Sequence, residues 1–262
     1  MKNKILLFIP TYNCEIQIER VLSSIIGAKV REKIDGLLII DNQSQDKTLE
    51  IAQKRLVEID LKDVRLFRNK FNYSLGGSHK VAFQLALESG YTHLISLHGD
   101  DQADVNDLKK VLGLIESDSY DMILGSRFMK DSQVKGYSVL RKIGNHLLNW
   151  LVSLRMLKQI SDLGSGLNAF SSTFMKDSFF SNCSDGLTFN NHLILCDSNR
   201  NRRRVFFPIS WKEEDQVSSA KIFLQGFEIL KLILVYGGSL KLKRVVDSCS
   251  HIEHESVLVW SN

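Results

Sequence analysis

Five short apolar segments in the first 130 residues constrain the fold of this chain more than any other feature. They are residues 5–9, 36–40, 64–67, 93–97 and 122–124, and stretches with helical periodicity separate them. Uninterrupted apolar strands that alternate with amphipathic helices are typical of a parallel sheet covered on both faces. We therefore predict an α/β protein with a Rossmann-like, mostly parallel central sheet and helices on both faces.

After residue 130 the pattern changes. We predict a long amphipathic helix over 140–157, a loop of small residues at 161–166, and a strand after the basic run at 202–204. Helical or mixed segments are expected at 170–180 and 187–196, an apolar helix at about 220–236, and a mixed tail after it. The chain has no internal repeat, low-complexity segment or linker, so we expect a single domain over residues 1–262.

The composition excludes several classes of protein. With 44% hydrophobic and 24% charged residues, the 262-residue chain is globular rather than disordered. Its net charge of +4 is too small to indicate a nucleic-acid partner, and we expect none. Four cysteines without a C-x-x-C pair favour a reduced cytoplasmic location and no cysteine metal site. The first apolar run ends at Pro10, too early for a signal peptide, and we see no membrane span.

Polar side chains follow three of the predicted strands. The clusters are residues 10–13, 41–44 and 98–102, after the first, second and fourth strands. Ligands of open parallel sheets lie beyond the carboxyl ends of the strands, so the three clusters predict one binding crevice.

The cluster after the fourth strand carries a candidate metal site. His98, Asp100 and Gln102 occupy alternate positions. Carboxylate and amide oxygens suit Mg²⁺ or Mn²⁺, and an imidazole ligand favours Mn²⁺. The alternative is a solvated acidic loop in which Asp104 caps the following helix.

Asp41 directly follows four apolar residues and so lies at the mouth of the sheet. Its carboxylate could accept N–H groups from the edge of a nucleobase. The alternative is a simple turn, with Asp46 capping the next helix.

Five motifs in this order resemble those of family 2 glycosyltransferases with the GT-A fold. PTYN, IIDNQSQDKT and HGDDQ follow the first, second and fourth strands, and GSRFMKD and SDLGSGLNAF come later. The set is similar to the dolichol- or polyprenyl-phosphate hexose synthase branch and spans about residues 4–230. The resemblance implies a GT-A fold, with residues 1–130 binding the nucleotide sugar and residues 131–262 forming the acceptor side.

The resemblance also implies roles for individual residues. The set expected to bind the nucleotide sugar is Pro10, Thr11, Tyr12, Asp41, Asn42, Ser165 and Gly166, the metal set is His98, Asp100 and Gln102, and the catalytic set is Asp100, Arg127 and Arg141. Pro10, Thr11 and Tyr12 would hold base and ribose. Arg127 and Arg141 would handle phosphate on the acceptor side, and the Ser165–Gly166 pair would line the sugar or acceptor pocket.

Three positions depart from the family pattern. His98 stands in place of the first Asp of D-x-D, and Asn42 in place of the second Asp after the second strand. Residues 189–192, Phe-Asn-Asn-His, stand where relatives often carry an acidic residue. The last departure removes an obvious general base, and an anionic phosphate acceptor needs none.

The resemblance therefore implies a metal-dependent inverting hexosyltransferase. Its donor would be a GDP-mannose- or UDP-glucose-type sugar, its acceptor polyprenyl or dolichyl phosphate, and its cofactor Mn²⁺ or Mg²⁺. Two alternatives stay open. One is transfer to a sugar hydroxyl in surface polysaccharide assembly, with His192 or Asp101 as base. The other is a non-catalytic module that binds nucleotide sugars.

Contact with the cytoplasmic membrane face, or with a membrane partner, is a further expectation. The apolar segment at 222–235, flanked by Lys221, could lie in a bilayer interface, and residues 200–204 could meet anionic headgroups. The alternatives are a helix packed on the core and a solvated basic edge.

Overall fold

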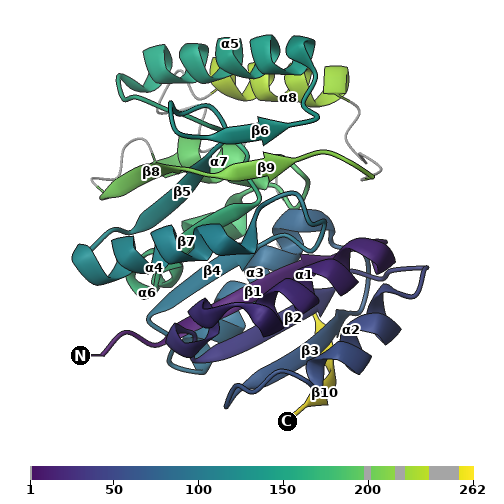
Figure 1. The fold of residues 1–262 in the computed structure, drawn as a ribbon. Helices are drawn as coiled ribbons and strands as arrows, with labels where there is room; N and C mark the ends of the chain where they lie inside the picture. Colours follow the sequence, from purple (N-terminus) through teal and green to yellow (C-terminus); the bar gives the residue numbers. More distant parts are fainter. Residues whose placement is uncertain (1, 198–201, 216–221, 236–253) are drawn as a thin grey trace.

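The computed structural model describes residues 2–197, 202–215, 222–235 and 254–262. An eight-stranded sheet runs through it in the order β10-β3-β2-β1-β4-β7-β5-β8 (Figure 1). The strands are β1 (Ile5–Thr11), β2 (Gly36–Asp41), β3 (Val64–Asn69), β4 (His93–Leu97), β5 (Met122–Ser126), β7 (Leu167–Ser171), β8 (Arg204–Pro208) and β10 (Ser256–Ser261). Strands β3, β2, β1 and β4 are parallel neighbours, which confirms the predicted mostly parallel sheet.

Helices cover both faces of this sheet, as predicted. On one face lie α1 (Glu15–Gly27), α2 (Thr48–Leu56) and α4 (Leu108–Ser117), and on the other α3 (Ser74–Glu88), α6 (Ser172–Lys176) and α7 (Phe189–Cys196) (Figure 1). Alternate strand residues separate the two cores: Leu7 and Leu37 pack with the first group of helices, and Leu6 and Leu38 with the second. Short 3₁₀ turns at Lys29–Lys33, Val105–Asp107 and Ser178–Asn182 complete these layers.

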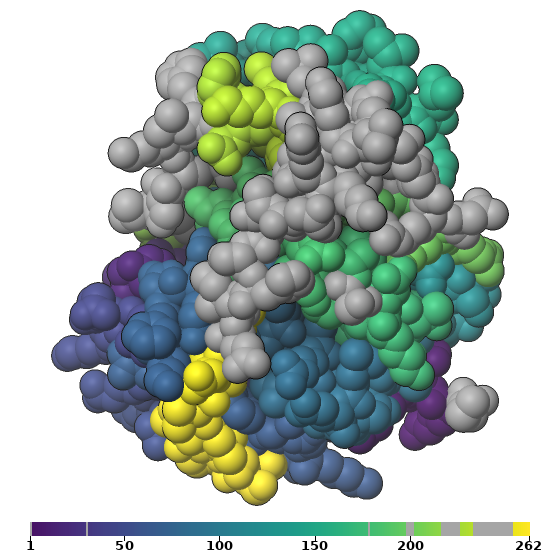
Figure 2. Space-filling view, turned by 180° about the vertical axis from the view of Figure 1, so that it is seen from behind, coloured from purple at the N-terminus to yellow at the C-terminus, as the bar shows by residue number. Residues whose placement is uncertain are grey.

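Two antiparallel strands differ from the prediction. Strand β7 lies between β4 and β5 and is antiparallel to both. No strand was predicted there, since only a helical or mixed segment at 170–180 was expected from the sequence. Strand β10, in the predicted mixed tail, pairs antiparallel with β3 at the sheet edge, and Figure 2 shows it in yellow on the outside of the molecule. Both strands are short. In β7 the apolar pattern is also interrupted by Asn168, a buried residue whose side-chain amide pairs with Ser165, which weakens the strand signal in the sequence.

Helix α3 begins at Ser74, four residues earlier than the predicted start at 78. Its first turn contains Gly76 and Gly77, residues that disfavour helix. Here both backbone N–H groups donate to Asp185 O. A Cβ atom at Gly76 would lie 2.4 Å from Ser184 O, so this close backbone approach requires glycine.

A second layer stands apart from the main sheet. It consists of the two-stranded sheet of β6 (Gln133–Lys135) and β9 (Ser210–Lys212), together with α5 (Val139–Met156) and α8 (Ile222–Val235). Helix α8 corresponds to the predicted apolar helix. Its Ile229 and Leu232 are buried in the core, and the helix packs against α5. Figure 1 shows α5 as the outermost element at the top of the molecule.

Among the described residues, none of the helices combines the length and the apolar character that a membrane crossing needs. The three described cysteines, Cys14, Cys183 and Cys196, are buried thiols.

Candidate functional site

The loops after β1, β2, β3 and β4 meet at one edge of the sheet, and each has a residue in the left-handed backbone region. Asn13, Gln43, Ser74 and Asp101 have φ values between 47° and 66°. Such conformations cost about 1 kcal/mol or more for residues other than glycine, and they cluster at binding sites. The loops are also cross-linked, since Gln45 N–H donates to Asn13 Oδ1 (2.8 Å). The predicted crevice edge is thus a braced structure.

Asp41 lies fully buried at the end of β2. Its Oδ2 accepts from Ser44 N–H (3.2 Å) and lies 3.3 Å from Arg68 Nε. Its Oδ1 is also buried but accepts no hydrogen bond from the described residues. A buried carboxylate oxygen without a donor is unfavourable in the free protein. This atom is therefore suited to accept an N–H group from a ligand.

The Asn42 side chain forms its hydrogen bonds with neighbouring residues of the protein. Its Oδ1 accepts from Asn69 Nδ2 and from Tyr73 N–H, both at 2.9 Å, and its Nδ2 donates to Asn72 Oδ1 (2.8 Å). The amide thus ties β2 to the loop between β3 and α3. The expected ligand contact of Asn42 would use the second N–H of its amide or replace one of these bonds.

The PTYN motif supplies one exposed ring. Pro10 and Thr11 are buried, and the Thr11 hydroxyl donates to Ile40 O (3.3 Å). Tyr12 is 44% exposed beside them. Gly99 packs against the Thr11 methyl group and donates its N–H to Pro10 O, which joins this motif to the HGDDQ loop. Of the three expected binding residues, Tyr12 alone presents its side chain to solvent.

His98 points into the protein rather than along the loop. It follows Ser96 on the face of β4 that packs against α3, and its ring lies 6.1 Å from that of His79. A Cβ atom at Gly166 would lie 3.0 Å from the His98 ring, so glycine gives the ring its place. Burial lowers the pKa of His98 to about 4, and its Nε2 has no hydrogen-bond partner. The ring is neutral and partly buried.

Asp100 and Gln102 bring oxygen donors to the crevice. Asp100 is partly buried, and burial raises the pKa of its carboxyl to about 6, with a smaller contribution from the charge of Asp101. Among the described residues, no group of three or more His, Cys, Asp and Glu side chains is arranged to hold a metal ion. The donor chemistry of Asp100 and Gln102 fits Mg²⁺ or Mn²⁺, provided that a ligand supplies further oxygens. The His98 ring packs between His79 and Gly166, and its place in the metal set stays a prediction.

Asp101 is committed to ion pairs. Its Oδ2 lies 2.7 Å from Arg20 Nε and 2.8 Å from Lys212 Nζ, and Arg20 also pairs with Asp215. These contacts anchor the HGDDQ loop to α1 and to β9. A carboxylate held by two cations is a poor general base, which counts against the role considered for Asp101.

Arg127 of the GSR motif forms a buried ion pair with Asp162. Two guanidinium nitrogens, Nε and Nη2, each lie 2.8 Å from an Asp162 oxygen, and Arg127 N–H also donates to that carboxylate (3.0 Å). Arg127 is 9% exposed and its guanidinium faces the ring of Trp211 at 5.2 Å. Desolvation lowers the pKa of Arg127, but the attraction of Asp162 outweighs it and keeps the group charged. The structure encloses Arg127 between Asp162 and Trp211, and its acceptor role stays a prediction.

Arg141 lies in the first turn of α5 and is less enclosed. Its Nη1 donates to Glu213 Oε2 (2.5 Å), and its guanidinium lies over the ring of Tyr137 at 4.6 Å. Tyr137 Oη in turn accepts from Arg127 Nη1 (3.3 Å). The two arginines therefore flank one tyrosine.

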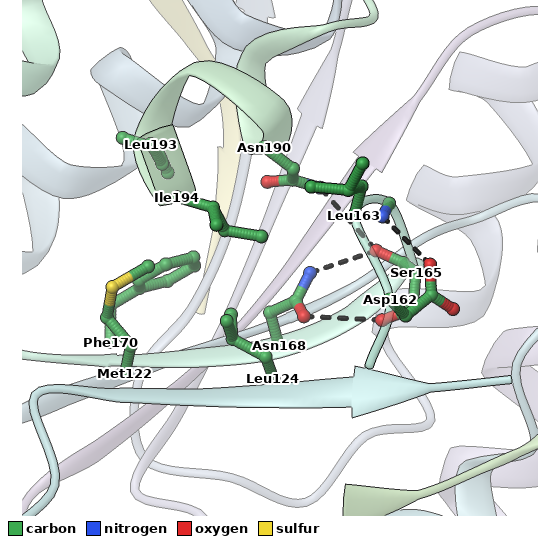
Figure 3. Close-up of a pocket in the computed structure, with 11 residues that line it drawn as sticks. Met122, Leu124, Asp162, Leu163, Ser165, Asn168, Phe170, Asn190, Leu193 and Ile194 are labelled. Atoms are coloured by element: carbon green, nitrogen blue, oxygen red, sulfur yellow. Dashed lines mark hydrogen bonds between the residues drawn. The ribbon is translucent and has the colours of Figure 1, made fainter. Parts of the chain in front are cut away.

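Ser165 lines a small cavity rather than an open pocket, and Gly166 follows it against the His98 ring. The cavity of about 10 Å³ has room for about one water molecule and is bordered by Asp162, Asn168 and Asn190 (Figure 3). The Ser165 hydroxyl donates to Leu167 O and Asn168 Oδ1, both at 3.2 Å. A sugar does not fit in this cavity, so the two residues shape the loop against which His98 packs.

The segment expected to lack a base lies at the start of α7, against this loop. Asn190 Nδ2 donates to Ser165 O (3.5 Å), and Asn190 Oδ1 has no hydrogen-bond partner. Burial lowers the pKa of His192 to about 4, with a smaller contribution from the charge of Lys80. His192 is thus neutral at pH 7.

The basic run at 202–204 is neutralised by neighbouring acids. Arg202 and Arg204 pair with buried Asp197, and Arg203 pairs with Asp118. Arg200 lies outside the described residues. These pairs favour the solvated-edge interpretation of the run.

Two residues of the site were missed from the sequence. Arg68 ends β3 beside Asp41, although the polar end of this strand, Arg68-Asn69, was visible in the sequence. Asp162 is the partner of Arg127, 35 residues away. That pairing had no sequence signal, because it depends on the antiparallel strand β7.

Comparisons with known proteins agree with this architecture. The family model described as "Glycosyl transferase family 2" matches residues 7–182. A UDP-N-acetylglucosamine–dolichyl-phosphate N-acetylglucosaminyltransferase of Methanococcus voltae is 26% identical, over 93% of this chain and 98% of its own. An undecaprenyl-phosphate mannosyltransferase of Micrococcus luteus is 25% identical, over 64% of this chain and 66% of its own.

Among solved structures, a glucosyl-3-phosphoglycerate synthase of Mycobacterium tuberculosis in complex with Mn²⁺, UDP-glucose and phosphoglyceric acid is similar. It has a TM-score of 0.66 at 14% sequence identity, with 90% of this chain and 80% of that chain covered. The likeness confirms the GT-A fold. With a family model that covers two thirds of the sequence and homologues that act on polyprenyl phosphates, the chain belongs to glycosyl transferase family 2.

Proposed function

We propose that this glycosyltransferase moves a hexose-type sugar from a nucleoside diphosphate sugar to a polyprenyl phosphate, with inversion at the anomeric carbon. The observation that carries the choice of acceptor is the double ion pair of Asp101 with Arg20 and Lys212. These two contacts occupy the carboxylate of Asp101, the residue that follows Asp100 in the chain. An acceptor phosphate is already anionic at pH 7 and needs no proton removed, whereas a sugar hydroxyl does.

On the donor side, Asp41 Oδ1 accepts an N–H group of the nucleobase, while Arg68 contacts the other carboxylate oxygen, Oδ2. Tyr12 lies exposed beside it and offers its ring to the base or ribose. The braced loops around Asn13 and Gln43 hold both groups in place without further ordering, so little entropy is lost on binding.

Asp100 and Gln102 hold the divalent cation together with the donor diphosphate. When bound, the cation neutralises charge on the departing nucleoside diphosphate. Mn²⁺ and Mg²⁺ both suit these oxygen donors, and His98 packs behind them as a neutral spacer against Gly166.

On the acceptor side, Arg141 contacts the phosphate and Arg127 acts from behind it. Arg141 is the more exposed of the two, and phosphate can compete with Glu213 for its guanidinium. Arg127, held by Asp162, adds positive charge and fixes Tyr137, over which Arg141 lies. This assignment keeps the acceptor role expected for both arginines but gives them different tasks.

Purified protein offered UDP- and GDP-sugars with Mn²⁺ should glycosylate a short, water-soluble isoprenyl phosphate and ignore a neutral sugar hydroxyl. Arg141→Gln should raise the KM for the isoprenyl phosphate about tenfold, the loss of one charge-assisted contact, with little change in nucleotide affinity. Lys135→Gln, an exposed cation on β6, is the matched control. Efficient transfer to a neutral sugar, with none to the isoprenyl phosphate, would overturn the proposal.

Transfer to a sugar hydroxyl is the second candidate, and His192 is the observation in its favour. A neutral imidazole at the start of α7 can accept a proton. In that case His192→Gln would abolish transfer to the sugar. Under the proposal above, the same variant transfers to the isoprenyl phosphate at a rate within about threefold of wild type.

A further inference from the structure

Helix α5 carries an apolar seam on its outer side. The seam consists of Leu140, Ile143, Leu147, Trp150, Leu154 and Leu157, which follow one another at alternating intervals of three and four residues. Each of these side chains is at least 55% exposed. An alternation of three and four places them on one face of the helix, about 26 Å long.

The inner side of α5 carries polar residues beside the apolar ones that pack on the core, among them Leu148 and Val152. Asn145 Nδ2 donates to Tyr137 Oη (2.9 Å), Asn149 Nδ2 donates to Ser161 O (3.0 Å), and Ser153 Oγ accepts from Ile160 N–H (2.9 Å). Asn149 and Val152 are the only residues of α5 that are buried. Because inward-facing apolar residues already pack α5 on the core, the exposed outer seam is not needed for that packing. A continuous apolar row on the surface of a helix is built to meet something apolar.

The charges on α5 are all positive. Arg141, Lys142 and Arg155 lie on the helix, Lys158 follows it, and the helix contains no acidic residue. Arg141 pairs with Glu213, and Lys142 and Lys158 are further cations that flank the seam. An apolar face bordered by lysine and arginine is complementary to an anionic lipid surface.

A groove of about 820 Å³ continues the seam toward the acceptor side. Trp150, Leu154 and Leu157 line one wall, and Phe128 and Met129 line the other. Phe128 directly follows Arg127, so the apolar surface reaches the residues expected to handle the acceptor phosphate.

We propose that α5 docks this protein on an anionic membrane surface, with the seam in the acyl boundary and the cations at the headgroups. The seam helix is α5, not the α8 segment expected from the sequence, since Ile229 and Leu232 of α8 are buried in the core. The inference deepens the proposed function, because a polyprenyl acceptor resides in a membrane. Binding of α5 to a membrane surface can be measured whether or not the protein is catalytically active.

A second copy of the chain is a weaker occupant of the seam. In a coiled coil the positions beside the seam carry opposite charges, whereas here they are Gly144, His146, Leu151 and Ser153. Pairing two copies of α5 would also bring like charges together.

The test is flotation of the full chain with vesicles that contain neither polyprenyl phosphate nor nucleotide. Wild type should float with vesicles of phosphatidylcholine containing about one third phosphatidylglycerol, and binding should fall with added salt. Leu147→Gln/Leu154→Gln should weaken binding at least tenfold, and Lys142→Gln about fivefold on anionic vesicles alone. Val57→Gln, an equally exposed apolar residue on another face, is the control and should bind like wild type.

Trp150 provides a second readout. Trp211 is buried and Trp260 is partly buried, so a blue shift of tryptophan emission on vesicle addition should disappear in Trp150→Phe while flotation persists. Unchanged flotation of the Leu147/Leu154 double variant, or no flotation of wild type, would overturn the inference. A dimer in solution that this variant dissociates would overturn it in favour of a second copy.

Failure of the proposed function gives a different result. The double variant should still transfer to the soluble isoprenyl phosphate at the wild-type rate. If neither protein transfers sugar but wild type floats, the docking surface stands and the assigned reaction is wrong.

Discussion

The donor half and the acceptor half of this molecule treat polar groups in opposite ways. At the carboxyl ends of β1 to β4, polar side chains are buried and bonded to one another, as in the Asn42–Asn69 contact, and Asp41 Oδ1 is left for a ligand. On α5, polar and apolar side chains share the inner side, while a continuous row of large apolar ones faces outward. The first arrangement suits a small polar ligand held by a rigid rim, and the second suits a partner that is not water. Variants in each region test this difference.

The largest effect is expected at Asp100. Asp100→Ala should lower turnover at least a hundredfold, because it removes the carboxylate proposed to hold the cation. The fold should survive, since Asp100 lies in a loop outside both cores. Asp104→Asn, at the neighbouring helix cap that accepts from Asn106 N–H, is the matched control. It should leave turnover unchanged. Near-normal turnover of Asp100→Ala in an Mn²⁺ titration would contradict the metal assignment.

The next effect concerns the buried pair of the acceptor half. Asp162→Asn should lower the free energy of unfolding by about 3–5 kcal/mol, because it leaves Arg127 charged and unpaired in the interior. Arg127→Met/Asp162→Leu should recover most of that loss in urea unfolding. If the stable double variant also keeps its KM for the isoprenyl phosphate, Arg127 has a purely structural role. A raised KM would instead support the proposed role of Arg127, which adds positive charge behind Arg141 and fixes Tyr137.

A smaller effect follows from His79, which lies behind the crevice among Phe8, Phe83 and Phe189. Burial lowers its pKa to about 3 from an ordinary value near 6.5. Below pH 6.5 the unfolded chain therefore binds a proton at this imidazole and the folded chain does not. The free energy of unfolding decreases as the pH is lowered. Between pH 7 and pH 5 this one group should cost about 2 kcal/mol.

Thermal or urea unfolding at several pH values checks this. His79→Phe should flatten the acid slope, in part only, because His98 and His192 also have lowered pKa values. An equally steep slope in His79→Phe would contradict the assignment.

The smallest effect is expected at Asp41. Asp41→Asn should weaken nucleoside diphosphate binding about tenfold, since a hydrogen bond to a charged acceptor contributes about 1.5 kcal/mol or more. Calorimetric titration with UDP and GDP measures this and identifies the base. Asp46→Asn, which removes an acceptor of Thr48 N–H, should lower stability slightly without changing nucleotide affinity. An equal loss of affinity in both variants would mean that Asp41 only supports the loop.

The sequence predicted the donor half well because its signals are local. An apolar run such as residues 93–97 marks a buried strand, and β4 spans those same residues. Polar residues directly after a strand must lie at its carboxyl end, so Asp41 and Asp100 could be placed at the crevice before any coordinates. The start of α3 was missed because two glycines at the start of a helix act against it, and only Asp185 from a distant loop satisfies their N–H groups.

The acceptor half could not be predicted in the same way, because its organisation depends on contacts between distant residues. The sequence by itself determined the alternation of strands and helices, the polar strand ends and the amphipathic character of residues 140–157. Only the tertiary structure decided that His98 turns toward His79, that Asp162 encloses Arg127, and that the apolar side of α5 faces outward. A helical period shows that a helix has two unlike faces, but which face meets the core depends on the elements packed against it.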